Sequence, residues 1–479
     1  MMAQNGICSL DVGYTPQEKQ SFWVHTLFAV ACLPLYYFVP TLFGLVISPY
    51  LLYLALAPKP QYLLPVVLHM AYGSQQRYFF CMGCFIYALM HYDQLVRLSL
   101  HLIFCIYLAI LPFFIWYLFQ KINGPKWVGG IGEVTGGIGQ YFVFSTVFWG
   151  ALAINKIDRL FYRGFLVFSL MLILVVSLKS GNAGSPLQEN GGARSLFSRE
   201  LFFSIPFACG MFWYSLTAKR LDLRFELMLS GLCTVIFFLD FVGLLRYSTT
   251  FTQLGSLLFT VFMIVVGRRM KNAYRWLNMF WFMLLSLVVV LVSARLVEKY
   301  GGLYDTSVRY EEIKRTDFSS LIEKLQRKAV DDRAQVWNVT IEHIKRMWKK
   351  KPIWIDISPY AEATVYVPGR GFVEIQMDMS SHNTMLELLR QYGFYGGLGL
   401  YVVFVLCFCR KINVQFLFQQ QKSCHVVLMA TCLSQAAVGG HTGHYPVLLT
   451  FGPVLFSCLG ACWRIAHESQ RQMFVVSMY

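Results

Sequence analysis

Residues 98–120 read LSLHLIFCIYLAILPFFIWYLFQ and contain no acidic or basic side chain other than one histidine. A helix that crosses a bilayer needs about 20 consecutive apolar residues. The stretch therefore predicts a membrane-spanning helix, and it sets the expectation for the rest of the chain.

Apolar runs of similar character recur on both sides of this stretch. Hydrophobic residues make up 56% of the chain and charged residues only 14%, whereas soluble domains carry about 25% charged residues. We therefore expect an all-α polytopic membrane helical bundle of about 12–14 spans. The further candidate spans are 22–39, 41–57, 61–73, 78–92, 141–155, 164–178, 200–217, 227–245, 251–267, 276–294, 393–409, 425–437 and 447–463.

The 13 cysteines form no regular framework. Cys81 and Cys84 have the spacing of a redox or metal pair, but they lie in an apolar run and no second pair accompanies them. We expect buried thiols, since free cysteine behaves as a small apolar residue.

Basic residues are distributed unequally between alternate connections, with 18 on one side and seven on the other. Cytoplasmic loops retain basic residues, so both termini are expected in the cytoplasm and the polar segment 295–392 outside it. This division predicts an N-terminal transmembrane bundle (1–294), an external catalytic loop (295–392) and C-terminal spans with a cytoplasmic tail (393–479). The net charge of +16 is then a topology signal and not a nucleic-acid surface.

Within the polar segment, residues 321–350 are predicted to be helical. Trp337, Ile341, Ile344 and Trp348 share one face of that helix, and Pro352 ends it. Residues 353–376 predict irregular or short-strand structure, and a second helix is expected to begin near Ser381.

The stretch SSHNTMLELLRQYGFYGG carries the strongest chemical signal. His382 has an ordinary pKa of about 6.5, so it can accept a proton from a hydroxyl group. Asn383 adjoins it, and Gly393 and Gly396 permit close helix packing. The alternative is a surface histidine at a helix start followed by packing glycines.

Arg333 precedes Trp337 by one helical turn. A guanidinium in such a position can hold phosphate oxygens bidentately. The alternative is that Asp331 or Asp332 neutralises Arg333 on a solvated face.

Four further residues are candidates. Asp240 is the one acidic residue inside a predicted span, where carboxylates are often functional, although it could instead pair with a basic residue for assembly. Arg246 lies at the outer end of the same span. His441 and His444 could line the site, but no third metal ligand accompanies them, so no metal is expected.

The pattern Arg-x-x-x-Trp (Arg333, Trp337) followed by His-Asn-x9-Gly-x-x-Gly (His382, Asn383, Gly393, Gly396) resembles the O-antigen ligase and O-antigen polymerase superfamily. The resemblance covers roughly residues 246–409. It implies a glycosyltransferase C-like membrane fold in the bacterial inner membrane, with a periplasmic active site.

The resemblance further implies a metal-independent glycosyltransferase without cofactors. Its donor would be a glycan on undecaprenyl pyrophosphate, and its acceptor a hydroxyl of lipid A-core or of another glycan. His382 would be the catalytic base, while Arg333 and Arg246 would bind the donor pyrophosphate. The strongly basic balance favours ligase over polymerase, because core lipid is phosphorylated.

The rival from a different class is a polysaccharide or lipid transporter or flippase. A transporter would carry ionisable residues at a midplane site in several spans, and Asp240 is the one acidic residue in the predicted spans. Membrane lipid is an expected partner in both cases, and nucleic acid in neither.

Overall fold

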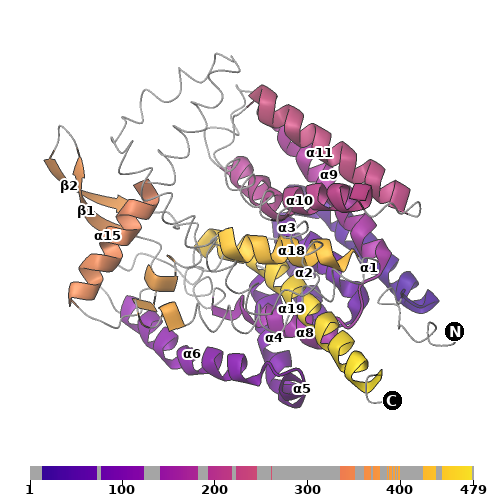
Figure 1. Cartoon of the computed structure of the whole chain (residues 1–479), viewed down its shortest axis with the longest axis horizontal. Helices are drawn as coiled ribbons and strands as arrows, with labels where there is room; N and C mark the ends of the chain where they lie inside the picture. The colour runs from indigo at the N-terminus through magenta and orange to yellow at the C-terminus, as the bar shows by residue number, and fades with distance from the viewer. Residues whose placement is uncertain are drawn as a thin grey trace.

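The computed structural model describes residues 13–72, 77–122, 141–181, 192–217, 223–244, 260, 335–350, 361–367, 371–377, 386, 388–390, 392, 393, 395, 397–399, 424–438 and 445–476. These residues are mostly helical, with one two-stranded sheet (Figure 1). Figure 1 shows α15 and the sheet at one side of the molecule and α9, α10 and α11 at the opposite side.

The N-terminal part contains α1 (Pro16–Phe38), α2 (Pro40–Leu56), η1 (Pro60–Tyr62), α3 (Leu63–Tyr72), α4 (Arg77–Met90), α5 (Tyr92–Arg97) and α6 (His101–Ile122). The remaining elements are α8 (Ser145–Ala153), α9 (Arg159–Gly181), α10 (Gly192–Thr217), α11 (Arg224–Leu244), α15 (Gln335–Lys350), β1 (Ala361–Val367), β2 (Gly371–Met377), α18 (His425–Val438) and α19 (Tyr445–Val476).

The first helix begins with a capped N-terminus at Thr15. The Thr15 hydroxyl accepts a hydrogen bond from the Glu18 backbone N–H, and the Glu18 carboxylate accepts one from the Thr15 N–H at 2.7 Å. This reciprocal arrangement is a capping box, and it satisfies two backbone donors that have no partner within the helix. Pro16 at the first helical position has its φ already set for the helix.

The core is built around the crossing of α8 and α19. A Cβ added to Gly150 would lie 2.1 Å from the Ser457 backbone oxygen, and one added to Gly460 would lie 2.0 Å from the Val147 oxygen. The two backbones therefore touch at these glycines. Trp149 and Trp463 are buried beside the crossing, and their indole N–H groups donate to the carbonyls of Leu54 (3.3 Å) and Leu98 (3.2 Å).

The expected polytopic bundle of 12–14 spans, and with it the glycosyltransferase C-like membrane fold, is wrong. No helix among the described residues combines the length and the hydropathy that crossing a membrane requires. Length is one reason, because several apolar runs form helices shorter than the 20 or so residues of a span. Those at 41–57, 61–73, 78–92, 141–155 and 425–437 form helices of 17, 10, 14, 9 and 14 residues.

Some apolar side chains of these short helices, such as Leu45 of α2 and Met90 of α4, are exposed, and many others are buried. Cys81 and Cys84 are examples, and both are buried free thiols as expected. The predicted span at 276–294 lies outside the described residues.

The polar segment forms the elements closest to the candidate site. Helix α15 ends at Lys350, shortly before Pro352, as predicted; the predicted helical residues 321–334 lie outside the described residues. Strands β1 and β2 pair antiparallel, with Thr364 opposite Glu374, so the short-strand alternative describes this part of 353–376. Helix α15 packs against β1.

Candidate functional site

The residues that follow the predicted base His382 form the first part of the candidate site. Leu386 and Leu389 are buried there. Gly393 has φ of 75°, a backbone conformation that residues with a Cβ atom rarely adopt. A Cβ on Gly397 would lie 2.3 Å from the Leu388 oxygen, so the backbone at Gly397 lies directly against the backbone at Leu388.

The second part of the candidate site is α15, whose first turn contains the backbone of Trp337. Thr340, His343 and Ile344 are buried at the i, i+3, i+4 spacing of one helix face, while Lys349 and Lys350 are exposed. The predicted helix is therefore present, but among the described members of its predicted apolar face Ile344 is buried whereas Trp348 is exposed. Its buried face includes His343, which the sequence pattern did not single out.

A ring contact joins these two parts. Trp348, in the last turn of α15, lies 5.8 Å from Tyr395 between ring centroids, with an interplanar angle of 58°. Tyr395 stands two residues after Gly393 in the sequence. The helix that follows Arg333 and the glycine motif that follows His382 are thus neighbours.

A tyrosine cluster connects the glycine motif with the N-terminal helices. The Tyr107 hydroxyl donates to the Tyr141 carbonyl at 2.7 Å, the Tyr141 hydroxyl donates to the Tyr107 carbonyl, and the rings stack with centroids 4.4 Å apart. Burial, and then the nearby Tyr392, raises the pKa of Tyr141. Burial raises the pKa of Tyr392 to about 12, so its hydroxyl stays protonated at neutral pH and cannot serve as a base there.

Arg390 is a residue that the sequence analysis missed. Its side chain is 1% exposed, and a guanidinium keeps its charge in proteins. A buried cation therefore lies between His382 and Gly393 in the sequence. The sequence feature that could have indicated its burial is its position four residues after the buried Leu386, which places both residues on one face of a helix.

The other predicted site residues are not placed by the described structure. Asp240 lies within α11, but its side chain is outside the description. Arg246, Arg333, His382, Asn383, Gly396, His441 and His444 all lie outside the described residues.

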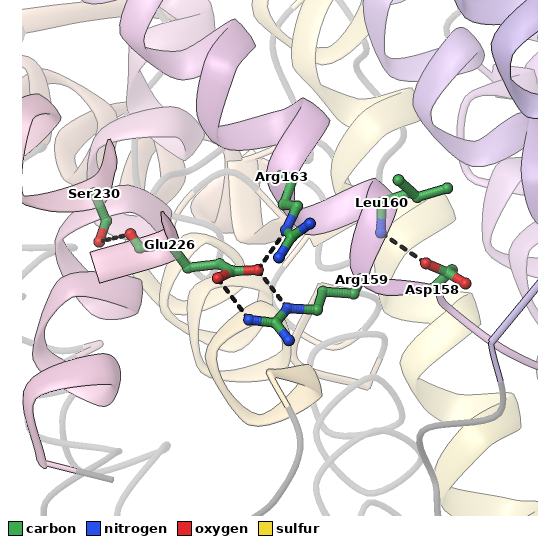
Figure 2. A network of polar contacts seen from close by, with 6 residues as sticks. All are labelled: Asp158, Arg159, Leu160, Arg163, Glu226 and Ser230. Atoms are coloured by element: carbon green, nitrogen blue, oxygen red, sulfur yellow. Dashed lines mark hydrogen bonds and ion pairs between the residues drawn. The ribbon is translucent and has the colours of Figure 1, made fainter. Parts of the chain in front are cut away.

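A separate polar network lies on α9 and α11, and Figure 2 shows both arginines directed at one carboxylate. Arg159 donates to Glu226 through Nε (2.5 Å) and Nη2 (2.8 Å), and Arg163 donates through Nε (2.8 Å). Burial acts to raise the pKa of Glu226, but these hydrogen bonds outweigh it and hold the pKa below its ordinary value. The network fixes α9 to α11, and we assign it a structural role.

In the described part of the chain, no group of three or more histidine, cysteine or acidic side chains has the geometry to hold a metal ion. Comparison with known proteins gives no match for the chain among family models, curated proteins or solved structures.

Proposed function

We propose that the chain transfers a glycan from undecaprenyl pyrophosphate to an acceptor hydroxyl at the periplasmic face of the bacterial inner membrane. The observation that carries the proposal is the His-Asn-x9-Gly-x-x-Gly pattern, together with the left-handed conformation of its Gly393. The contact of Trp348 with Tyr395 supports it, because that contact makes α15 and the glycine motif neighbours.

In the proposed reaction, His382 takes the proton of the acceptor hydroxyl, and the hydroxyl oxygen forms a bond to the anomeric carbon of the donor. The bond between that carbon and the pyrophosphate oxygen breaks, and undecaprenyl pyrophosphate leaves with both bonding electrons. Arg333 and Arg246 stabilise the negative charge that develops on the leaving group. Arginine suits this role because its planar fork matches phosphate oxygens.

We favour lipid A-core as the acceptor, since the net charge of +16 suits a phosphorylated lipid. Polymerase activity uses the same motif and donor, so a gel of lipopolysaccharide from a deletion strain separates the two. Core without any O-antigen supports ligase activity, and core with a single repeat unit supports polymerase activity. An unchanged ladder would refute glycan transfer of either kind.

Complementation of that strain tests the residue roles. His382→Ala should not restore the ladder, because loss of a positioned base slows a reaction by a factor of about 10² to 10⁴. Arg333→Lys should restore it poorly, since a point charge does not replace a bidentate fork. Both variants must accumulate to the level of the unaltered chain. Transfer by the purified protein should persist in excess chelator, and activity that returns only with magnesium or manganese would contradict a metal-independent reaction.

A further inference from the structure

A group of polar aromatic side chains surrounds His25 where α1, α2 and η1 meet. Its members are His25 of α1, Tyr50 and Tyr53 of α2, Tyr62 of η1, and Lys59 immediately before η1. We refer to these five residues as the His25 cluster. None of them belongs to the candidate transferase site. Each of the four side chains other than His25 has a hydroxyl or ammonium group that can donate a hydrogen bond.

Short contacts hold the His25 cluster together. His25 Nδ1 lies 2.7 Å from the Tyr50 hydroxyl, and the Tyr53 and Tyr62 hydroxyls are 3.4 Å apart. The His25 and Tyr62 rings meet edge to face with centroids 4.5 Å apart. Lys59 Nζ lies 5.8 Å from the centre of the Tyr62 ring, so the ammonium group stands beside the aromatic faces.

The chemistry of the cluster is that of a hydrogen-bond donor. Burial, and then the charge of Lys59, lowers the pKa of His25, so the imidazole is neutral at pH 7. Burial raises the pKa of Tyr62 to about 12, and its hydroxyl stays protonated. When Nδ1 of His25 accepts the Tyr50 proton, the imidazole proton is on Nε2, which is then a donor.

The cluster has an inner and an outer side. On the inner side, the buried His69 ring lies 5.3 Å from the Tyr50 ring. On the outer side, the Tyr53 side chain is 48% exposed and Lys59 is exposed. Within the described residues, no carboxylate forms an ion pair with Lys59. The exposed edge therefore combines a positive charge with neutral donors.

We propose that the exposed edge of the His25 cluster binds the phosphate group of an anionic ligand. Lys59 supplies the charge, and the Nε2–H of His25 and the Tyr53 hydroxyl supply hydrogen bonds. Lysine recognises phosphate as a point charge. This proposal does not depend on the proposed transferase function.

The test uses the full-length purified chain and inorganic pyrophosphate at constant ionic strength, with Arg246→Gln and Arg333→Gln in every sample so that the pyrophosphate site of the proposed transferase does not contribute. A ligand that binds the folded state raises the unfolding temperature, and the concentration dependence of that rise gives Kd. Lys59→Gln and Tyr53→Phe should each weaken binding, by about tenfold for the lysine, which is the usual effect of losing one charge-assisted hydrogen bond. The matched controls are Lys349→Gln, an exposed lysine on α15, and Tyr92→Phe, a tyrosine on α5 with an exposed ring.

A second measurement follows His25 directly. Pyrophosphate should raise the pKa of the His25 imidazole in a histidine NMR titration, because a nearby anion favours the charged form. The His25 resonance is assigned from its absence in His25→Gln. An unchanged His25 pKa at saturating pyrophosphate would overturn the proposal even if the unfolding temperature rises.

Vesicles separate a soluble ligand from a lipid headgroup. Binding to phosphatidylglycerol vesicles but not to phosphatidylcholine vesicles, reduced by Lys59→Gln and not by Lys349→Gln, would identify the phosphate as that of a lipid. Binding of pyrophosphate that is weakened by Lys59→Gln and not by Lys349→Gln, without binding to vesicles, would identify the ligand as a soluble phosphate compound. Equal effects of Lys59→Gln and Lys349→Gln, or no binding in either assay, would overturn the proposal.

Discussion

At the scale of single residues, Gly393 links the sequence motif to the backbone. The motif predicted a glycine for close packing, and the structure adds a second requirement, since Gly393 has φ of 75° and is buried. A Cβ atom in the left-handed region lies too close to the following carbonyl oxygen. The residue is therefore required for its conformation as well as for its small size.

Replacing Gly393 should accordingly destabilise the fold. We expect Gly393→Ala to lower the free energy of unfolding by about 1–2 kcal/mol, and Gly393→Asn to lower it less because asparagine tolerates positive φ. Urea unfolding measures both. Gly399→Ala is the control, since a Cβ there meets nothing within 4 Å. Equal decreases in the free energy of unfolding for Gly393→Ala and Gly399→Ala would show that the positive φ at residue 393 does not disfavour alanine.

The polar residues that were missed share one physical property. Arg390, His343 and Glu226 are buried, whereas hydrophobic periodicity predicts the burial of apolar side chains alone. A buried charge is stable where partners from other parts of the chain compensate for its lost hydration. Those partners are distant in sequence, as Arg159 and Glu226 illustrate, so local patterns could not identify them.

At the scale of elements, the sequence predicted which segments are helical better than it predicted how long each helix is. The end of α15 before Pro352 was expected, and so was short-strand structure after it, but the buried face of α15 differs from the predicted one. The apolar runs were expected to be spans because they are long and nearly free of charge. Composition does not show where neighbouring helices cross. Helix α8, with only nine residues, packs on α19 through Gly150 and Gly460. This packing depends on the backbones of two helices, so the sequence pattern of either helix alone does not reveal it.

The ion-pair network between α9 and α11 should show an asymmetry between its partners. The Glu226 side chain is fully buried, whereas those of Arg159 and Arg163 are 35% and 40% exposed. Replacing both arginines with glutamine leaves a buried carboxylate without them and should cost about 3–5 kcal/mol. Glu226→Gln should cost less, about 1–2 kcal/mol, because water can solvate the remaining guanidinium groups. Denaturant unfolding at pH 7 compares the variants.

The pH dependence gives an independent check on this network. The folded-state pKa of Glu226 lies below its ordinary value of 4.5, so its contribution to stability is present above pH 4.5 and is lost as the pH falls through the lowered pKa. The stability difference between the unaltered chain and Glu226→Gln should therefore be largest at pH 7 and shrink in acid. A difference that grows in acid would contradict the assignment.

At the scale of the whole molecule, the described core joins residues from both ends of the chain. The indole of Trp463 in α19 donates to Leu98, 365 residues earlier in the sequence, and α19 also packs against α3, α4 and α8. No local pattern predicts a contact across that separation. The individual helices could therefore be predicted from the sequence, but their arrangement could not. It also means that α19 completes a core formed by the N-terminal helices.

If α19 completes that core, its loss should open the N-terminal helices as well. Trp463→Ala removes a buried indole and its hydrogen bond, and it should lower the free energy of unfolding by about 3–5 kcal/mol. Hydrogen exchange should then accelerate together in α8 and α19, because the two helices open as one cooperative unit. Trp116→Ala is the matched control, since Trp116 is exposed on α6 and such changes usually stay within about 0.5 kcal/mol. Faster exchange confined to α19 would mean that the N-terminal helices form a stable core without it.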